Sequence, residues 1–356
     1  MKKVLIAPNK YVQGPEVLNN LDNLLEDFGK NIFIIMDPDI KSIVIDILNR
    51  GLKEKEKHIE NFQGECSKKE IDRIKEKAEN FDLILGIGGG KTLDTAKAVA
   101  HYLNMPVGIV PTIAATDAPC SALSVIYTEE GNFEEYLFLP SNPDIVIVDT
   151  KIIAEAPERF LISGMGDALA TYFEARVCQK TNKQSIAGGT QTITANNLAK
   201  LCYDTLLKYG KIAKASVKNN SVTEALEKIV EANTLLSGLG FESGGLAAAH
   251  AIHNGFTVLE EVHDKTHGEK VAFSTIVQLI LEDACPEEIE RVINFCKEMG
   301  LPTTLKELGI EKIDENKIMK VAEKSCVEGE TIHNLPFEVK PKMVKDAILT
   351  ANHIGK

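Results

Sequence analysis

The chain has 356 residues, a formal net charge of −12 and a hydrophobic content of 44%. The negative charge would repel nucleic acid and anionic lipid, and the apolar runs are far shorter than the roughly 20 residues of a membrane-spanning helix, so we expect neither a nucleic-acid nor a membrane partner. The length exceeds that of one core and predicts two domains, and the seven dispersed cysteines indicate free thiols in a reducing cytoplasm.

Short apolar runs alternate with amphipathic stretches in the first half of the chain. Candidate strands lie at residues 4–7, 32–36, 83–86, 107–110 and 145–148. Candidate helices lie at residues 15–28, 39–48, 68–79 and 92–102, and a hairpin is expected from 124–127 to 136–139. Strands that alternate with helices form βαβ units, so the pattern predicts an α/β domain with a mainly parallel sheet.

Strand-like runs become rare after Pro157. Apolar residues then recur at three- and four-residue spacing, which predicts helices at residues 166–177, 195–209, 222–236, 245–259, 272–281, 286–298 and 318–323. We therefore expect an α/β domain at residues 1–155 and an all-helical domain at residues 156–356. A cleft between two such domains is a common place for ligands to bind.

A glycine-rich segment follows the third candidate strand and leads directly into a helix. Four glycines stand within the five positions 86–90, and Lys91 follows them. Glycines allow close backbone approach, and the N-terminus of a helix attracts phosphate, so we expect a phosphate to bind here. The spacing matches neither Gly-x-Gly-x-x-Gly nor Walker A. A plain strand-to-helix turn is the alternative, but it explains fewer of the glycines.

Asp37 follows the second candidate strand. An acidic residue at this place in a nucleotide-binding fold hydrogen-bonds a ribose. The dipeptide with Pro38 also suits a turn or a helix cap, so the sequence leaves both roles open.

Metal-binding residue types occur in three segments of the second half. Asp167 is expected in the first turn of a helix, where it could also serve as a cap. His250 and His253 are about one helical turn apart among small residues, and His263 and His267 lie at the start of another helix. Two histidines and a carboxylate with an open position are typical of a catalytic zinc site. Spacing does not choose between the two histidines of either pair.

These motifs, in this order and spacing, resemble the glycerol dehydrogenase branch of the iron-containing alcohol dehydrogenase superfamily. The resemblance rests on residues 86–97, on residues 111–127 and on the metal segments, and it extends over nearly the whole chain. It implies a dehydroquinate synthase-like fold, in which an NAD-binding α/β domain precedes an all-α domain that binds metal and substrate. Ala115 departs from the pattern, because many relatives have serine there.

The resemblance also implies roles for individual residues. Asp167, His250 and His267 would bind one zinc ion and, together with Asp117, would be the catalytic and substrate-binding residues. Iron-type members have a further histidine four positions after the aspartate, where this chain has Thr171, so zinc is favoured over iron. The NAD contacts would be Asp37, Gly88, Gly89, Gly90, Lys91, Thr92, Asp94, Thr112, Ser121, Leu123 and Tyr127.

The activity implied is NAD-dependent oxidation of glycerol, or of a related small vicinal diol, at a zinc site where the substrate hydroxyl loses its proton. Asp117 would bind the neighbouring hydroxyl and so favour diols; its alternative role is that of a turn residue before Pro119. Rival activities on this fold are a glycerol-1-phosphate dehydrogenase and a sugar phosphate cyclase. A nucleotide-binding protein without activity is an alternative of another class. Relatives suggest a homo-oligomer, such as an octamer.

Overall fold

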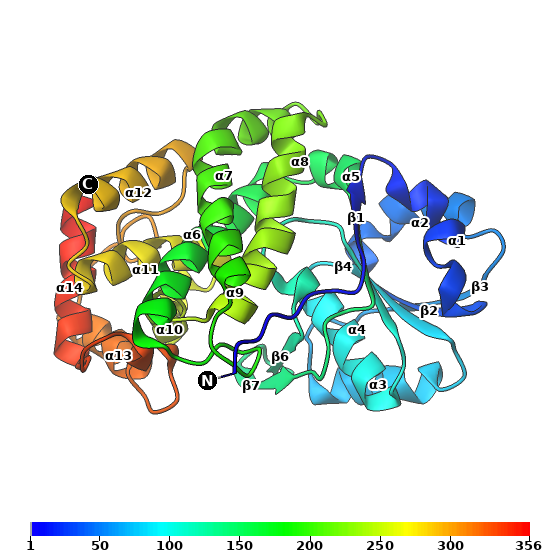
Figure 1. Ribbon diagram of the computed structural model, residues 1–356, viewed down its shortest axis with the longest axis horizontal. Helices are drawn as coiled ribbons and strands as arrows, with labels where there is room; N and C mark the ends of the chain where they lie inside the picture. Colours follow the sequence, from blue (N-terminus) through cyan, green and yellow to red (C-terminus); the bar gives the residue numbers. More distant parts are fainter. Residues whose placement is uncertain (1) are drawn as a thin grey trace.

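The computed structural model describes residues 2–356 and has an α/β half beside a helical half (Figure 1). A six-stranded sheet with the order β1-β8-β5-β4-β2-β3 is parallel throughout. This confirms the predicted fold class. The strands are β1 (Tyr11–Gly14), β2 (Asn31–Met36), β3 (Glu56–Asn61), β4 (Leu83–Gly88), β5 (Val107–Pro111) and β8 (Ile145–Asp149).

Helices cover both faces of this sheet. Ile32, Ile34 and Met36 of β2 pack in one hydrophobic cluster, which includes residues of α1 (Leu21–Leu24) and α2 (Lys41–Gly51). Phe33 and Ile35 pack in the other cluster, with residues of α3 (Lys68–Ala78) and α4 (Gly90–Leu103). Successive side chains of a strand point to opposite faces, so a sheet that is buried on both sides needs strands without polar alternation. The continuous apolar runs in the sequence have this cause.

A separate two-stranded antiparallel sheet follows β5, as predicted. It consists of β6 (Leu123–Tyr127) and β7 (Phe133–Phe138) and is preceded by the short 3₁₀ helix η4 (Ala118–Cys120). The hairpin is tied to α4, because the Ser124 hydroxyl donates a hydrogen bond of 2.9 Å to the carbonyl oxygen of Asp94.

The elements from Thr150 to the end of the described chain are helical. They are α5 (Thr150–Glu155), α6 (Glu158–Thr181), α7 (Ile193–Lys218), α8 (Glu224–Glu231), the π-helical segment η5 (Ala232–Leu236), α9 (Ser237–Gly244), α10 (Ala248–Phe256), the 3₁₀ helix η6 (Glu260–Val262), α11 (His267–Leu281), α12 (Pro286–Met299), α13 (Glu315–Ser325), the 3₁₀ helix η7 (Thr331–Asn334) and α14 (Pro341–Ile354). The helix α6 packs against α7 and α11 and is buried on nearly every side. Among the helices described for residues 2–356, none combines the length and apolar character needed to cross a membrane.

Two predictions near the N-terminus are wrong. Residues 4–7 do not form a strand. They run along the helical half, where the Val4 amide donates to the Thr190 carbonyl at 3.2 Å and the Ile6 amide donates to the Ser243 hydroxyl at 3.1 Å. Residues 15–28 are not one helix but three short pieces, the 3₁₀ helices η1 (Val17–Asn20) and η2 (Glu26–Phe28) on either side of α1. The Asp149 carboxylate accepts the amides of Glu16 and Leu18 and so fixes the first piece as a turn on the sheet.

Several elements were not predicted from the sequence, among them the strand β3 and the helices α9 and α14. The strand β3 pairs only with β2 at the edge of the sheet. An edge strand is buried less than a central one, so its polar sequence gave no apolar run to detect.

Candidate active site

The glycine-rich segment forms the junction between β4 and α4. The strand ends at Gly88, Gly89 caps the helix, and Gly90 is its first residue. A Cβ atom on Gly88 would lie 2.9 Å from the Cβ of Asp37, so no larger residue fits there without a shift. The first amides of a helix have no partner within the helix, and they remain free for an anion. The geometry therefore suits a phosphate.

Asp37 lies directly beside this junction. Its amide donates to the Ile87 carbonyl at 3.0 Å, and its carboxylate accepts the Asp39 amide at 3.0 Å as the cap of the 3₁₀ helix η3 (Pro38–Ile40). The turn-capping role is thus present in the structure. The position next to Gly88 is also the one that a ribose-binding carboxylate needs.

Two charged residues predicted to contact NAD are engaged within the protein. The Lys91 ammonium lies 2.5 Å from a Glu65 carboxylate oxygen. The Asp94 carboxylate lies 2.8 Å from the Lys97 ammonium and accepts the Val125 amide at 3.0 Å. Asp94 therefore ties α4 to the strand β6. Thr92, one of the other predicted contacts, is buried in the first turn of α4.

Lys97 is a residue that the sequence analysis passed over. Its side chain is fully buried, and its ammonium donates to the carbonyl oxygens of Ala118 at 2.9 Å and of Leu123. It also contacts the Ser121 hydroxyl at 3.3 Å. The predicted nicotinamide-side residues Thr112, Ser121, Leu123 and Tyr127 lie on the segment from the end of β5 through β6. Lys97 holds the middle of this segment against α4.

Asp167 lies in the middle of α6, so its placement in a first turn is wrong. The helix begins at Glu158 and continues through Gly164 and Gly166. A Cβ atom on Gly166 would overlap the carbonyl oxygen of Gly268. The glycine in α6 therefore lets the first turn of α11 approach closely and brings His267 to Asp167.

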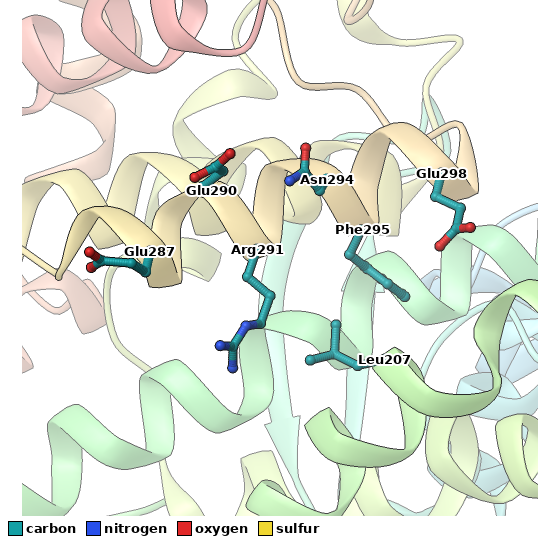
Figure 2. A pocket seen from close by; sticks show the side chains of 7 residues that line it. All are labelled: Leu207, Glu287, Glu290, Arg291, Asn294, Phe295 and Glu298. Atoms are coloured by element: carbon teal, nitrogen blue, oxygen red, sulfur yellow. The ribbon is translucent and has the colours of Figure 1, made fainter.

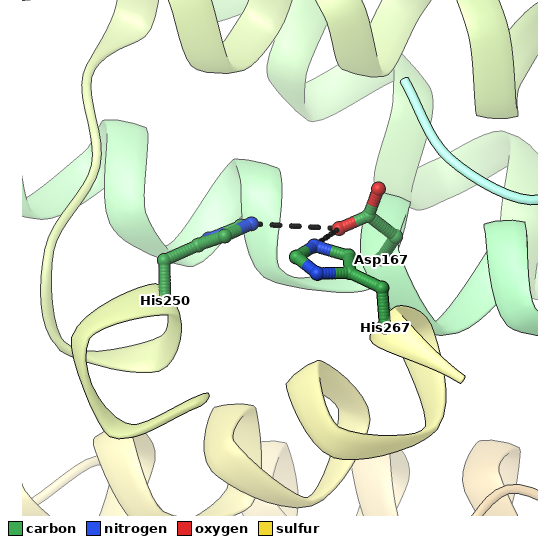
Figure 3. Close-up of side chains that lie close together, drawn as sticks. All are labelled: Asp167, His250 and His267. Carbon is green, nitrogen blue, oxygen red and sulfur yellow. Dashed lines mark ion pairs between the residues drawn. The ribbon is translucent and has the colours of Figure 1, made fainter. Parts of the chain in front are cut away.

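Asp167, His250 and His267 point toward one another from α6, α10 and α11 (Figure 3). One Asp167 oxygen, Oδ1, lies 2.9 Å from His267 Nε2 and 3.4 Å from His250 Nε2. Within residues 2–356 this is the one group of at least three such side chains arranged to hold a metal ion. The structure thus brings together the histidine of each pair that the resemblance indicates.

The other histidine of each predicted pair, His253 or His263, lies outside this group. The ring of His253 is buried and lies edge-on to the ring of His267, with 4.3 Å between the ring centres. His263 is exposed, and its Nε2 lies 3.4 Å from the Thr257 carbonyl oxygen. Helical spacing had left both as alternatives.

The chemistry of the three side chains fits zinc. The Oδ1 atom of Asp167 is buried and has no hydrogen-bond partner in the described chain, while it faces both imidazole Nε2 atoms. Burial opposes ionisation, but the charge of His267 and the contacts from both imidazoles hold the pKa of Asp167 well below its usual range. One carboxylate oxygen and two imidazole nitrogens are a donor set of catalytic zinc sites.

Glu174 supports the group and was missed in the sequence. It is fully buried on α6, two helical turns after Asp167, and its Oε2 lies 2.6 Å from His250 Nδ1. Its other oxygen accepts the amides of Ala247 and His250 at 2.8 and 3.1 Å. A carboxylate that holds one imidazole nitrogen leaves the other free to bind a metal ion, here the nitrogen that faces Asp167. The spacing of two acids by seven residues in α6 was the signal.

Asp117 joins the α/β half to this group. Its amide donates to Oδ2 of Asp167 at 3.3 Å, and its carboxylate accepts a hydrogen bond of 2.8 Å from the Ser237 hydroxyl. Burial and the nearby charge of Asp167 raise the pKa of Asp117 well above its usual value. If a small substrate bound at the metal group, its second hydroxyl would lie near Asp117, because Asp117 is hydrogen-bonded to Asp167.

A separate pocket of about 610 Å³ lies between α7 and α12 (Figure 2). Its lining includes Glu287, Glu290 and Glu298 together with Arg291. None of the lining residues belongs to the predicted site. Mixed charges along a groove between two surface helices are typical of a solvated face.

Comparisons with known proteins show what the whole chain is similar to. Residues 8–150 match the family described as iron-containing alcohol dehydrogenase. The chain is 53% identical to a glycerol dehydrogenase of Citrobacter freundii over 100% of this chain and 99% of the relative. It is 54% identical to a glycerol dehydrogenase of Thermotoga maritima, with 99% and 97% covered. The solved structure of glycerol dehydrogenase from Schizosaccharomyces pombe is similar with a TM-score of 0.96 at 40% identity, covering 99% of this chain and 91% of that chain.

Proposed function

The chain belongs to the iron-containing alcohol dehydrogenase family, and on that premise we propose that it oxidises glycerol or a closely related small vicinal diol, with NAD as hydride acceptor and zinc as metal ion. The observation that carries the proposal is the contact between the metal group of the helical half and Asp117 of the α/β half. The group of Asp167, His250 and His267 lies at the seam of the two halves, and the Asp117 amide is bonded directly to its carboxylate.

Each residue of the group has a distinct task in this proposal. Asp167, His250 and His267 would hold the zinc ion, and Glu174 would keep the His250 ring in the orientation that binding requires. When bound, zinc supplies Lewis acidity that lowers the pKa of an alcohol hydroxyl. The Asp117 carboxylate would accept a hydrogen bond from the neighbouring hydroxyl of the substrate and so fix which carbon faces the nicotinamide.

The glycine junction supports the cofactor part of the proposal. The amides at the start of α4 would bind the pyrophosphate, and Asp37 would accept hydrogen bonds from the adenosine ribose. A carboxylate at that position repels the extra phosphate of NADP, which favours NAD. When bound, NAD would supply the hydride acceptor. An assembly of several copies, as in the resemblance, stays a prediction.

The test combines metal analysis with a substrate panel. We expect zinc to copurify in equimolar amount, and we expect NAD reduction to be faster with glycerol, propane-1,2-diol and butane-2,3-diol than with propan-2-ol. Asp117→Ala should lower kcat/KM for the diols more than for propan-2-ol, because a polar partner left unpaired penalises the wrong substrate strongly.

Two results would contradict the proposal. A preparation that lacks divalent metal and still turns over would remove the metal assignment. Cofactor that is reduced and reoxidised within one cycle, with no net NADH, would indicate a cyclase instead.

A further inference from the structure

A chain of hydroxyl groups reaches the Asp117 carboxylate from the helical half. The Ser237 hydroxyl lies 2.8 Å from Asp117 Oδ2, and the Thr171 hydroxyl lies 2.8 Å from the Ser237 hydroxyl. Ser237 and Thr171 are both fully buried. The three residues belong to three elements, the loop before η4, the start of α9 and the middle of α6. The contact therefore spans the seam between the two halves.

The direction of these hydrogen bonds follows from the number of protons. The Ser237 hydroxyl donates to Oδ2 of Asp117, and this contact uses its single hydroxyl proton. Its oxygen must then accept from Thr171, for whose hydroxyl the described chain offers no other hydrogen-bond partner. Each hydroxyl donates once, toward the carboxylate. In such a chain the second hydrogen bond polarises the first and strengthens it.

The π-helical segment η5 presents Ser237 to the loop that carries Asp117. Within the same segment, the side-chain amide of Asn233 donates to the carbonyl oxygens of Ala114 and Leu161 at 3.0 and 3.1 Å. A π-helical turn displaces the side chains that follow it from their α-helical positions. Asn233 therefore fixes the backbone of the loop while Ser237 fixes the Asp117 side chain.

Thr171 lies four residues after Asp167, where iron-type relatives have a further histidine ligand. Its methyl group packs against α9 so closely that a Cβ atom on Gly240 would lie 2.5 Å from it. Its hydroxyl is directed to Ser237. Thr171 therefore contacts Ser237, which holds Asp117, and is not part of the metal group.

We propose that Thr171 and Ser237 are positioning residues that set substrate specificity, because they hold the Asp117 carboxylate where it accepts the second hydroxyl of a vicinal diol. The proposal rests on the proposed function, in which Asp117 contacts the substrate. A mono-alcohol makes no use of the carboxylate, so its turnover does not depend on the hydroxyl chain. A diol does depend on it, because a carboxylate that rotates freely must lose that freedom when the diol binds, and this loss weakens the affinity for the diol.

The experiment removes one hydroxyl at a time without changing side-chain size greatly. Thr171→Val and Ser237→Ala are compared with Thr275→Val and Ser274→Ala, two fully buried positions on α11 whose hydroxyls donate only to carbonyl groups of their own helix. Steady-state kinetics are measured with propane-1,2-diol and propan-2-ol. We expect kcat/KM for the diol to fall about tenfold in both test variants, through KM, as the loss of one hydrogen bond between buried groups implies.

The expected change for propan-2-ol is less than about twofold in all four variants, and the two controls should leave the ratio of diol to mono-alcohol efficiency unchanged. Ser237→Thr and Thr171→Ser keep the hydroxyl and should restore at least part of the diol preference. Should Ser237→Ala fail to fold, the pair Thr171→Val and Thr171→Ser decides the question alone.

The proposal is overturned if both substrates lose efficiency equally, or if the test variants behave like the controls. Those outcomes differ from a failure of the proposed function, which would appear in the wild-type protein as a lack of diol preference and in Asp117→Ala as unchanged selectivity.

Discussion

The glycine junction and the metal group offer their ligands opposite kinds of chemical groups. Residues 86–94 are contiguous, and they offer backbone amides at the end of one strand and the start of one helix. Asp167, His250 and His267 offer side chains from three helices, held by further buried groups such as Glu174. A site made of backbone needs space, so it fails when atoms are added. A site made of side chains needs ligands, so it fails when atoms are removed.

The largest expected effect comes from Asp167→Ala. Loss of the one buried carboxylate of the metal group should abolish zinc binding and lower kcat/KM for glycerol by at least about a thousandfold, since Lewis-acid assistance amounts to several kcal/mol. The dissociation constant for NADH, measured by fluorescence, should stay within about twofold of wild type. If the variant lost zinc binding and NADH binding to the same degree, the two regions would not be independent.

Glu174→Gln tests the support of the metal group. The residue touches His250 and not the predicted ligand position itself, so zinc should still bind, but about 10- to 100-fold more weakly in competition with a chelator. NADH affinity should not change. Unaltered zinc affinity would mean that the contact at 2.6 Å serves only the packing of α6 against α10.

Gly88→Ala adds one methyl group to the other region. The new Cβ atom would lie 2.9 Å from the Cβ of Asp37 and 3.0 Å from Thr92, in a backbone conformation with φ of +155° that side chains disfavour. We expect NADH affinity to fall about tenfold while zinc content stays at wild-type level. Gly188→Ala is the control, because Gly188 also has positive φ but no neighbour within 4 Å. Equal loss of NADH affinity in both variants would rule out a local steric cause.

The smallest effect concerns the seam between the α/β half and the helical half. Glu242 of α9 is fully buried and accepts the Ala122 amide at 2.6 Å and the Asn142 side-chain amide at 2.5 Å. Burial raises the pKa of Glu242 to about 7. The unfolded value is about 4.3, so the folded protein takes up a proton first as the pH falls. The stability contribution of Glu242 therefore increases as the pH falls from 7 toward 4.3 and is lost above pH 7.

The measurement compares urea unfolding of the metal-free wild type and Glu242→Gln between pH 7.5 and 6. The wild type should gain about 1 kcal/mol relative to the variant over the pH unit below 7. Glu224→Gln, at an exposed position on α8, is the control and should show no such trend. A constant difference between wild type and Glu242→Gln would show that this carboxyl does not titrate in the window.

The sequence analysis was most accurate where a signal is local. The strands at 32–36, 83–86, 107–110 and 145–148 and the hairpin are confirmed, because strands buried on both faces read as apolar runs. The glycine junction was found for the same reason, since one strand end and one helix start contain all of it. The strand predictions were least accurate at the N-terminus and at the edge of the sheet. Residues 4–7 are apolar but pair with no strand of the sheet, whereas β3 is polar and does pair.

The amino-acid sequence by itself determined the fold class, the glycine junction between a strand and a helix, and the residue types of a candidate metal group, because each depends on neighbouring residues or on a recurring period. Only the tertiary structure decided which side chains meet. The alternative role of Asp167 as a helix cap is excluded because α6 begins at Glu158. The contacts of Glu174, Ser237 and Lys97 are with distant segments of the chain, so their neighbours in sequence did not predict them. A buried polar side chain must find a partner, and that partner is chosen by packing in space and not by position in the chain.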